Sequence, residues 1–417
     1  MSRPAVDFLF SLERFGMKFG LANIATLCTA LGNPQHAFPS VIVAGTNGKG
    51  SVTTMVDTAL RAAGHRSARY TSPHLQRLEE RFVIDGREVA PALLEASAAR
   101  IRHAAETLVA SGDLASLPTF FECTTAVAFD LFRDAQAAIA VLEVGLGGRL
   151  DSTNIVSPIA AAIVSIDFDH EEQLGNTLAS IAAEKAGVIK PGIPVVCGPL
   201  PAAALEVIER VCREQRATLV RTDIDEALAA RLDSMPIALA GAHQRANAAV
   251  AMGLLHAIDR DLVRGVRVGA EAMRAGVTTA AWPGRLEQFQ LGDCRLLLDA
   301  AHNPAGARAL ASYLHGNAPD GVTLVFAAMR DKAVVEMLTA LAPAALSIVC
   351  TTAPNPRALP ADELAAIARD LGLRAEAVPD PHEAVIAACA QGRPVVVAGS
   401  IFLIGPVRER LGRDILR

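Results

Sequence analysis

Short apolar runs alternate with amphipathic stretches along the whole chain, a pattern typical of parallel α/β units. Residues 40–45 predict a buried strand, and residues 51–63 repeat apolar positions at a spacing near 3.6, which predicts the helix after it. Further strands are predicted at 138–144, 160–166 and 194–197. Because these runs are almost continuously hydrophobic, we expect a sheet covered by helices on both faces.

The pattern is interrupted near residues 282–290, where Pro283 and Gly284 break it, and then begins again. Beyond the break, each predicted strand is followed by a helical stretch; these strands span 295–301, 322–329, 345–352 and 393–400. A chain of 417 residues exceeds what one hydrophobic core usually serves. We therefore expect an α/β protein with a P-loop ATPase-like parallel-sheet domain at 1–286 and a smaller Rossmann-like α/β domain at 287–417.

The composition narrows the class of protein. Hydrophobic residues make up 51% of the chain and charged residues 20%, which is typical of folded proteins. A net charge of −5 and an aromatic content of 4% argue against a nucleic-acid surface. The longest apolar runs are shorter than the roughly 20 residues of a membrane-spanning helix, and residues 1–17 lack a signal-peptide cleavage pattern. We expect a cytoplasmic monomer with neither a membrane nor a nucleic acid as partner.

The cysteines are dispersed and show no paired spacing. This distribution predicts reduced thiols and neither a disulfide framework nor a zinc site. The seven positions are Cys28, Cys123, Cys197, Cys212, Cys294, Cys350 and Cys389.

A glycine-rich segment lies between the first predicted strand and its helix, where a phosphate-binding loop must lie. Glycines let the backbone approach phosphate closely, amide groups at the helix N-terminus supply partial positive charge, and Lys49 adds a full charge. The spacing differs from Gly-x4-Gly-Lys-Ser/Thr, because the first glycine is two residues closer and Gly50 precedes Ser51. An ordinary glycine-rich turn is the alternative, but it does not require the lysine and the hydroxyl. The predicted ATP contacts here are Gly45, Thr46, Asn47, Gly48, Lys49, Gly50 and Ser51.

This loop resembles the phosphate loop of the Mur ligases, and other motifs extend the resemblance over nearly the whole chain. They are YTSPHL at 70–75, EVGLGGRLD at 143–151, EKAG at 184–187, GR at 284–285 and DAAHNP at 299–304. The first two of these are similar to the folylpolyglutamate synthase/dihydrofolate synthase branch in particular.

The resemblance implies an ATP-dependent amide ligase of folate biosynthesis and one-carbon metabolism. It would add L-glutamate to dihydropteroate, to reduced folates or to both, through an acyl phosphate. Three alternatives stay open: a monofunctional folylpolyglutamate synthase, a ligase of UDP-linked cell-wall precursors, and a P-loop nucleotide switch. Residues 118–122, which resemble the pterin-binding segment of the folate branch, and the short region before the phosphate loop weigh against the cell-wall ligase. The lack of an Asn/Thr-Lys-x-Asp motif weighs against a guanine-nucleotide switch.

The acidic and hydroxyl residues suggest magnesium, which prefers hard oxygen ligands. Glu143 ends a predicted buried strand, where ligands gather in open α/β sheets, and Ser51 offers a hydroxyl. The resemblance implies that Ser72, Glu143 and His170 complete the sites of two magnesium ions. Considered alone, Ser72 also fits a helix cap and His170 a surface polar cluster.

Lys185 lies in a predicted helix over residues 178–188, and its spacing alone predicts a solvated side chain. The resemblance implies the opposite, a carbamylated Lys185 that acts as an anion near the metals. Burial that lowers the lysine pKa would allow the amine to react with carbon dioxide. Together with Lys49, Glu143 and His170, Lys185 forms the predicted catalytic set.

The resemblance also implies the remaining contacts. Asn247 and Arg285 would contact phosphates, while Asp299 and His302 would lie on the ribose and base side of ATP. Asp299 also fits a helix N-cap.

Three residues match the pterin contacts of the folate branch: Thr119, Phe121 and Asp151. A phenylalanine at such a position is usually part of the core, and Asp151 also fits a turn or cap.

Overall fold

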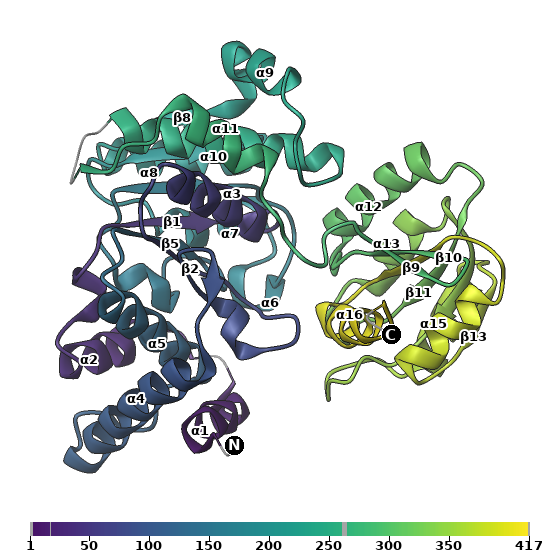
Figure 1. The fold of residues 1–417 in the computed structure, drawn as a ribbon, viewed down its shortest axis with the longest axis horizontal. Helices are drawn as coiled ribbons and strands as arrows, with labels where there is room; N and C mark the ends of the chain where they lie inside the picture. The colour runs from purple at the N-terminus through teal and green to yellow at the C-terminus, as the bar shows by residue number, and fades with distance from the viewer. Residues whose placement is uncertain (1–2, 17, 261–264, 416–417) are drawn as a thin grey trace. The chain divides into compact units, whose positions relative to one another are not determined.

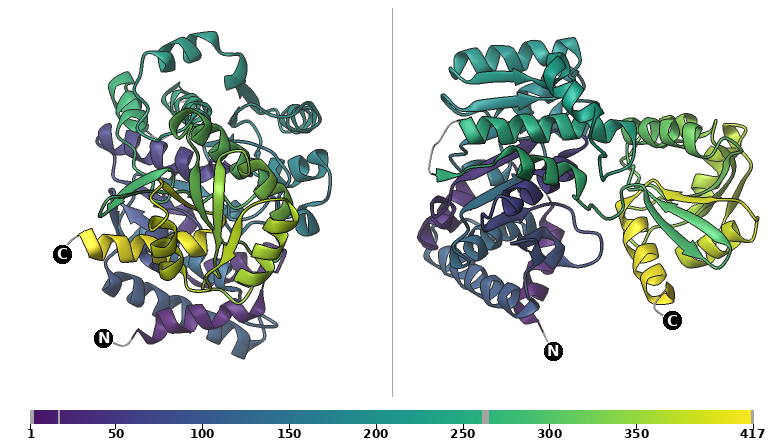
Figure 2. Two further views of the ribbon diagram at one scale, coloured as in Figure 1. Left: turned by 90° about the vertical axis from the view of Figure 1, so that its right-hand side faces the viewer. Right: turned by 45° about the horizontal axis from the view of Figure 1, so that its top comes forward.

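The computed structural model describes residues 3–16, 18–260 and 265–415. The chain divides into two compact units, each with its own sheet (Figures 1 and 2). Unit 1 comprises Met1–Ala238 and Arg245–Ala280, and unit 2 comprises Leu239–Gln244 and Ala281–Arg417. Both units are α/β, as the sequence predicts.

In the described part of unit 1, eight strands form one sheet in the order β4-β3-β2-β5-β1-β6-β7-β8. Neighbours from β2 to β8 pair in parallel, and β3 and β4 add an antiparallel edge. The strands are β1 (Ser40–Ala44), β2 (Ser67–Tyr70), β3 (Phe82–Ile84), β4 (Arg87–Glu88), β5 (Ile139–Glu143), β6 (Ala160–Ile163), β7 (Pro194–Cys197) and β8 (Thr218–Arg221). All four strands predicted in this region are confirmed, although β6 ends earlier than expected.

The helices of unit 1 cover both faces of this sheet. Their bounds are α1 (Pro4–Ser11), α2 (Ala22–Ala30), α3 (Lys49–Ala62), α4 (Pro91–Ser111), α5 (Phe120–Asp134), α6 (Glu171–Leu174), α7 (Leu178–Ala186), α8 (Ala202–Glu214), α9 (Glu226–Asp233), α10 (Ala242–Arg260, whose first residues belong to unit 2) and α11 (Ala270–Thr278). Ser67 of β2 donates a hydrogen bond to Asp57 of α3, whereas Ala68 and Tyr70 join the apolar cluster formed with α5. Since successive strand residues point to opposite faces, α3 and α5 cover opposite faces.

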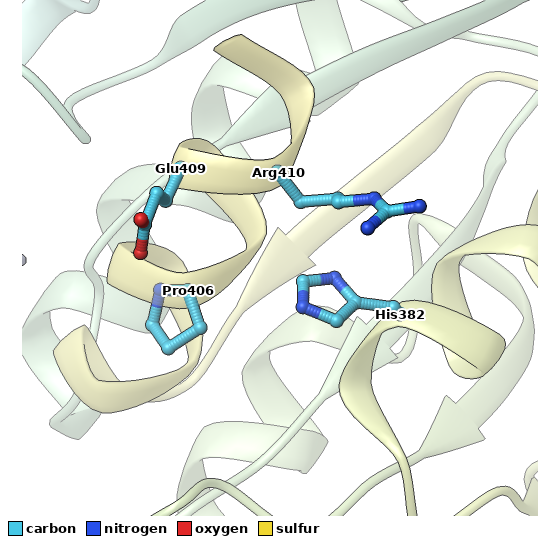
Figure 3. Close-up of a pocket in the computed structure, with 4 residues that line it drawn as sticks. All are labelled: His382, Pro406, Glu409 and Arg410. Carbon is cyan, nitrogen blue, oxygen red and sulfur yellow. The ribbon is translucent and has the colours of Figure 1, made fainter. Parts of the chain in front are cut away.

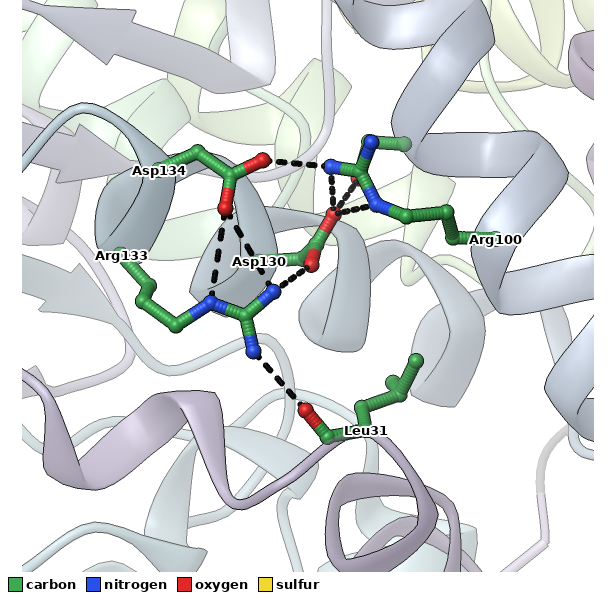
Figure 4. A network of polar contacts seen from close by, with 6 residues as sticks. Leu31, Arg100, Asp130, Arg133 and Asp134 are labelled. Atoms are coloured by element: carbon green, nitrogen blue, oxygen red, sulfur yellow. Dashed lines mark hydrogen bonds and ion pairs between the residues drawn. The ribbon is translucent and has the colours of Figure 1, made fainter.

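A charged cluster joins α4 to α5 (Figure 4). Asp130 is fully buried and accepts hydrogen bonds from Arg100 and Arg133, and Arg133 also donates to the Leu31 carbonyl oxygen at 2.8 Å. A buried carboxylate without such partners would carry a large desolvation cost. The cluster therefore fixes the helical layer from which Phe121 projects.

In the described part of unit 2, six strands form a second sheet in the order β13-β12-β11-β14-β10-β9. Only the β9–β10 pair is antiparallel. The strands are β9 (Glu287–Leu291), β10 (Cys294–Leu298), β11 (Val322–Phe326), β12 (Ala345–Cys350), β13 (Ala375–Ala377) and β14 (Val395–Ala398); the helices are α12 (Pro304–Asn317), α13 (Val334–Leu341), α14 (Ala361–Asp370), α15 (Pro381–Cys389) and α16 (Ile401–Ile415). The four strands predicted here are confirmed. The partly polar strands β9 and β13 lack the apolar run on which that prediction depends.

The expectation of uniformly reduced cysteines is wrong for one pair. Cys294 and Cys389 form a disulfide across a sequence separation of 95 residues, with their Cα atoms 5.6 Å apart. The error has a simple cause, since sequence spacing cannot reveal a pair that only the packing of α15 against the sheet brings together. The other five cysteines are free and buried.

None of the helices in the described residues is both long and apolar enough to span a membrane.

Candidate active site

Four neighbouring strands bring the predicted catalytic residues to one edge of the unit 1 sheet. The strands β2, β5, β1 and β6 are adjacent and mutually parallel, so their carboxyl ends lie side by side. Ser72 follows β2, Glu143 is the last residue of β5, the phosphate loop follows β1, and His170 lies in the segment after β6. This edge is where open α/β sheets bind ligands.

The phosphate loop is held by the segment that follows β6. The Thr46 N–H donates to the Ser165 carbonyl oxygen at 2.9 Å, and the Asn47 N–H donates to Ser165 Oγ at 3.0 Å. The Thr46 hydroxyl in turn accepts from the N–H of Asp167 at 3.1 Å. Lys49 starts α3 and its Nζ donates to the carbonyl oxygens of Gly45 and Thr46, each at 3.1 Å. The sequence did not single out Ser165, because it lies inside the strand predicted at 160–166, whereas β6 ends at Ile163.

Asn247 of α10 lies against this loop. Gly48 has φ +82°, a backbone conformation that residues other than glycine rarely adopt. A Cβ built on Gly48 would overlap Asn247 Oδ1. Asn247 is 6% exposed. Glycine at position 48 is therefore required twice, by its backbone conformation and by the close approach of the asparagine.

Glu143 is buried at the end of β5, and its Oε2 accepts a hydrogen bond from the Ser72 N–H at 3.1 Å. The two residues are 71 positions apart in sequence but adjacent in space. The two residues predicted for one metal ion are thus brought together by two adjacent strands.

His170 has a left-handed backbone conformation, φ 53° and ψ 41°, and directly precedes α6. Its N–H donates to Asp169 Oδ1 at 3.0 Å, and its Nε2 lies 3.8 Å from the same oxygen. The side chain is 37% exposed. The imidazole is therefore accessible to solvent, as a side chain that binds a metal ion from solution must be.

Lys185 is buried, which contradicts the solvated side chain that spacing alone predicts. It is 4% exposed, and its Nζ donates to the Gly45 carbonyl oxygen at 2.9 Å. Desolvation by burial, and then the nearby charge of Lys49, lower the Lys185 pKa to about 7. A large fraction of the amine is therefore neutral near pH 7.

The predicted pterin residues Phe121 and Asp151 lie close together beside Gly145. A Cβ built on Gly145 would overlap the Phe121 ring and would lie 3.2 Å from Asp151 Oδ2. Asp151 accepts from the N–H groups of Leu146, at 2.9 Å, and Thr153, at 3.0 Å. Burial raises the Asp151 pKa, while these hydrogen bonds oppose the increase.

Thr119 forms the N-cap of α5. Its hydroxyl accepts from the Glu122 N–H at 3.2 Å, and its own N–H donates to Glu122 Oε2 at 2.7 Å. This reciprocal capping box fixes the start of the helix that carries Phe121. Asp151 likewise caps the short 3-10 helix Ser152–Ile155 through Thr153. The cap that the sequence left open for Asp151 is therefore present, and Thr119 has a capping role that the sequence did not predict.

His74 of the Ser-Pro-His-Leu motif is a neutral acceptor in this region. Its Nδ1 accepts from Arg81 Nε at 2.9 Å. Burial, and then the positive charge of Arg81, lower the His74 pKa to about 3. The ring therefore stays uncharged through the physiological range.

In unit 2, the predicted Asp299 follows the end of β10. Its two carboxylate oxygens accept from the N–H groups of Leu286, at 3.0 Å, and Ala301, at 2.9 Å. Desolvation by burial raises the Asp299 pKa, whereas Arg285 opposes the increase. The N-cap of α12 is Asn303, which accepts from Gly306. Asp299 is thus no helix cap; it ties residues 284–286 to the sheet.

The other unit 2 residues lie on the same two segments. Arg285 Nη1 donates to the Gly284 carbonyl oxygen at 3.1 Å, and His302 Nδ1 lies 2.9 Å from the Ala300 carbonyl oxygen. Sequence reasoning missed Glu287, which accepts from the Gly284 N–H at 2.7 Å and pairs with Arg408 of α16. Spacing could not reveal this pair, because its members are 121 positions apart.

Two hollows in unit 2 are lined by none of the predicted site residues. One of about 130 Å³ lies beside α15 and α16 and is lined by His382, Pro406, Glu409 and Arg410 (Figure 3). The other, of about 420 Å³, is lined by Leu291, Asp293, Cys294, Arg295, Cys389, Gly392, Arg393 and Pro394.

Among the described residues, no three His, Cys, Asp or Glu side chains gather as a metal site.

The family model described as "Mur ligase, glutamate ligase domain" matches residues 284–401. A Mycobacterium tuberculosis protein named "Dihydrofolate synthase/folylpolyglutamate synthase" is 35% identical, with 94% of this chain and 90% of that protein covered. A Haloferax volcanii protein named "Probable bifunctional folylpolyglutamate synthase/dihydropteroate synthase" is also 35% identical over 99% of this chain. The chain spans only about half of that longer relative, 51% of its length.

Solved structures are similar over almost the whole chain. Escherichia coli FolC in complex with DHPP and ADP has a TM-score of 0.86 at 29% identity, covering 99% of this chain and 98% of that one. A bifunctional folylpolyglutamate synthase/dihydrofolate synthase with Mn, AMPPNP and L-glutamate bound has a TM-score of 0.85 at 32% identity, covering 98% of each chain.

Proposed function

The chain belongs to the dihydrofolate synthase/folylpolyglutamate synthase family of Mur ligases, and we propose on that premise that it is an ATP-dependent ligase adding L-glutamate to a pteroate or folate carboxylate. One observation carries the proposal. The carboxyl ends of four adjacent parallel strands bring a phosphate loop, a buried glutamate and an accessible histidine to one edge of the unit 1 sheet.

The proposed reaction has two steps. The γ-phosphoryl group of ATP passes to the substrate carboxylate, which forms an acyl phosphate and releases ADP. The amino group of L-glutamate then attacks the acyl carbon, gives up a proton and forms the amide as inorganic phosphate leaves. Lys49 and the backbone amides at the start of α3 suit the first step, because they place positive charge where phosphate oxygens bind.

The donor chemistry of the site fits magnesium, since Glu143 supplies a carboxylate, Ser51 and Ser72 supply hydroxyls, and His170 supplies an imidazole. Two ions held by these residues would offset the repulsion between the substrate carboxylate and the phosphates. Glu143 has a structural role as well, because it links the end of β5 to the segment after β2. Glu143 does so through its hydrogen bond with the Ser72 backbone.

Carbamylation of Lys185 is part of the proposal. The buried amine, its lowered pKa and its closeness to the phosphate loop support it. The uncharged amine attacks carbon dioxide and loses a proton, so that a carbamate anion replaces a potential cation beside the metals. The hydrogen bond to the Gly45 carbonyl keeps that nitrogen next to the loop.

For the substrate we propose both dihydropteroate and reduced folates. The Phe121 ring beside the Asp151 carboxylate suits a flat heterocycle with ring nitrogens, and the FolC structure with DHPP and ADP supports the choice. In unit 2, Arg285, Asp299 and His302 are proposed to contact ATP. A monofunctional folylpolyglutamate synthase is the remaining alternative.

An ADP-release assay tests the ligase. With MgATP and a reduced folate present, ADP release should depend on added L-glutamate and should match the amide formed. A nucleotide switch would hydrolyse ATP without glutamate, and that result would overturn the proposal.

A further inference from the structure

The disulfide of unit 2 joins two segments at the amino ends of neighbouring strands. Cys294 begins β10, and Cys389 ends α15, shortly before β14. Their Cα separation of 5.6 Å lies within the normal range for a disulfide. Because β10 and β14 pair directly, with Leu296 opposite Val395, the bond ties the start of one strand to the approach of the next.

These two cysteines differ from the others in their accessibility. Both are partly exposed, whereas the remaining five are buried. Burial raises the pKa of Cys28, Cys197 and Cys350 to about 12 and that of Cys212 to about 11, and it raises the pKa of Cys123 as well. Thiols of this kind react slowly, because the thiolate is the reactive form. Thiol chemistry on the folded protein is therefore restricted to one pair.

The bond faces the hollow of about 420 Å³ described above, large enough for a small organic thiol. Arg295 and Arg393 line this hollow, and Asp293 supplies a single opposing charge. Neither arginine forms an ion pair with another described residue, so both guanidinium groups can contact a molecule in the hollow. Positive charge beside a cysteine favours its thiolate, both as an attacking group and as a leaving group.

The position of the bond separates it from the proposed nucleotide contacts. Asp299 and His302 follow the carboxyl end of β10, and Cys294 lies at its amino end. Opening the bond removes no side chain from the proposed active site. Its physical effect is to lower the stability of unit 2, because a covalent tie across 95 residues restricts the unfolded chain strongly.

We propose that Cys294 and Cys389 form a thiol–disulfide exchange site for small anionic thiols, and that its redox state sets the stability of unit 2. The thiolate of one small thiol attacks a cysteine sulfur, the Sγ–Sγ bond breaks, and the released cysteine takes up the proton. A second thiol attacks the mixed disulfide, releases the other cysteine and forms the disulfide of the two small thiols. The protein gains two electrons and two protons, both supplied by the thiols, and the small disulfide reverses the reaction.

Alkylation mapped by mass spectrometry tests the site on the full chain. The folded protein, equilibrated with glutathione disulfide and desalted, should show no iodoacetamide adduct on any cysteine. After treatment with reduced glutathione, adducts should appear on Cys294 and Cys389 while the other five stay unmodified. Adducts on both residues before reduction, or no adducts after it, would overturn the proposal.

Two further measurements test the charge and stability claims. The disulfide of the variant R295A/R393A should be reduced by glutathione at least several-fold more slowly than that of wild type. Its rate of reduction by dithiothreitol, an uncharged dithiol, should differ less from the wild-type rate. Reduction should lower the unfolding midpoint of unit 2 by roughly 10 °C, and the variant C294S/C389S should match reduced wild type and ignore the redox buffer. Equal midpoints for oxidised and reduced wild type would contradict the stability claim. None of these readouts depends on ligase activity, so they stand apart from the test of the proposed function.

Discussion

At the residue scale, the site depends on groups whose conformation or charge is unusual. Gly45 and Gly48 have φ values of +155° and +82°, and a side chain at either position would meet neighbouring residues. Lys49 and Lys185 both donate to the Gly45 carbonyl oxygen, so two amines are drawn to one point of the phosphate loop. Lys49 would supply positive charge for a bound phosphate, whereas the Lys185 amine is largely neutral near pH 7 because burial lowers its pKa to about 7.

The variant Lys49→Ala should fold normally and lose about two to three orders of magnitude in turnover, as expected for one transition-state contact. Steady-state ADP release measures the loss. Lys190→Ala serves as control, because Lys190 lies outside the loop and its Nζ donates to the Asn154 carbonyl oxygen at 3.4 Å. A normal rate for Lys49→Ala would show that the loop does not bind phosphate.

The variant Glu143→Gln keeps the shape of the side chain but removes its charge. The Ser72 N–H can still donate to the amide oxygen, so the fold should persist. The magnesium concentration for half-maximal rate should rise roughly tenfold, since a charge-assisted ligand is lost. A magnesium titration identical to that of wild type would remove Glu143 from the metal site.

Lys185 should titrate in the neutral range. Its pKa falls from 10.5 in the unfolded chain to about 7 in the fold, so the neutral amine increases as the pH rises through about 7. Below pH 7 the Lys185 amine is protonated in both the folded and the unfolded chain, and its burial costs the full desolvation penalty. Between pH 7 and 10.5 the unfolded chain binds more protons than the folded chain, so the free energy of unfolding increases with pH.

At constant carbon dioxide pressure, the carbamate signal in ¹³C NMR should therefore grow from pH 6 to pH 8. Lys185→Ala should lack this signal and be nearly inactive, and acetate should restore part of its rate by filling the vacated anion position. A carbamate signal that persists in Lys185→Ala would assign the modification to another amine.

At the element scale, the structure shows how α16 holds a distant segment. Arg408 Nε donates to both carboxylate oxygens of Glu287, at 3.0 and 2.8 Å, and Glu287 accepts from the Gly284 N–H. Asp299, which follows β10, accepts a hydrogen bond from the N–H of Leu286, the residue after Arg285. Arg285 therefore lies in a segment held by α16, 121 positions from Glu287, and by Asp299, 13 positions from Leu286.

Removing this support with Arg408→Gln should raise the KM for ATP about three- to tenfold and change kcat little. The pair is partly exposed, so the loss of unfolding free energy should stay near 1 kcal/mol. Arg210→Gln breaks an exposed pair with Glu214 on α8 and provides the matched control. If both variants keep the wild-type KM, α16 does not position Arg285.

At the scale of the whole molecule, two α/β units with separate cores divide the proposed work. Unit 1 carries the phosphate loop, the predicted metal ligands and the predicted pterin contacts, while unit 2 carries Arg285, Asp299 and His302, which are proposed to contact ATP. The family model for the glutamate ligase domain matches residues 284–401, which lie within unit 2.

Substrate breadth belongs to this scale, because it requires the complete protein. We expect ADP release with L-glutamate and dihydropteroate, and also with L-glutamate and tetrahydrofolate. Phe121→Ala should weaken dihydropteroate binding by about tenfold or more, through lost contact with the ring. If dihydropteroate stimulates no ADP release while tetrahydrofolate does, the protein is a monofunctional folylpolyglutamate synthase.

The amino-acid sequence by itself determined the fold class and most of the central strands. Buried parallel strands must be continuous apolar runs, and a loop that binds phosphate must combine glycines, a lysine and a hydroxyl at a strand-to-helix junction, so both leave a local pattern. The edge strands β4, β9 and β13 leave no such pattern, because their side chains are exposed or only partly buried. The strand β3 is apolar but has only three residues, which is too short for a recognisable run.

The tertiary structure alone decided the burial of Lys185, the disulfide and the Glu287–Arg408 pair, because each depends on residues far apart in sequence. Spacing predicts a solvated Lys185, yet packing buries it against Gly45, which is 140 positions away. Cys294 and Cys389 are 95 positions apart in sequence, and the packing of α15 brings them together. Glu287 pairs with Arg408 because α16 contacts β9. Burial, charge pairing and disulfide formation depend on through-space distance, and a local pattern contains no information about the partner.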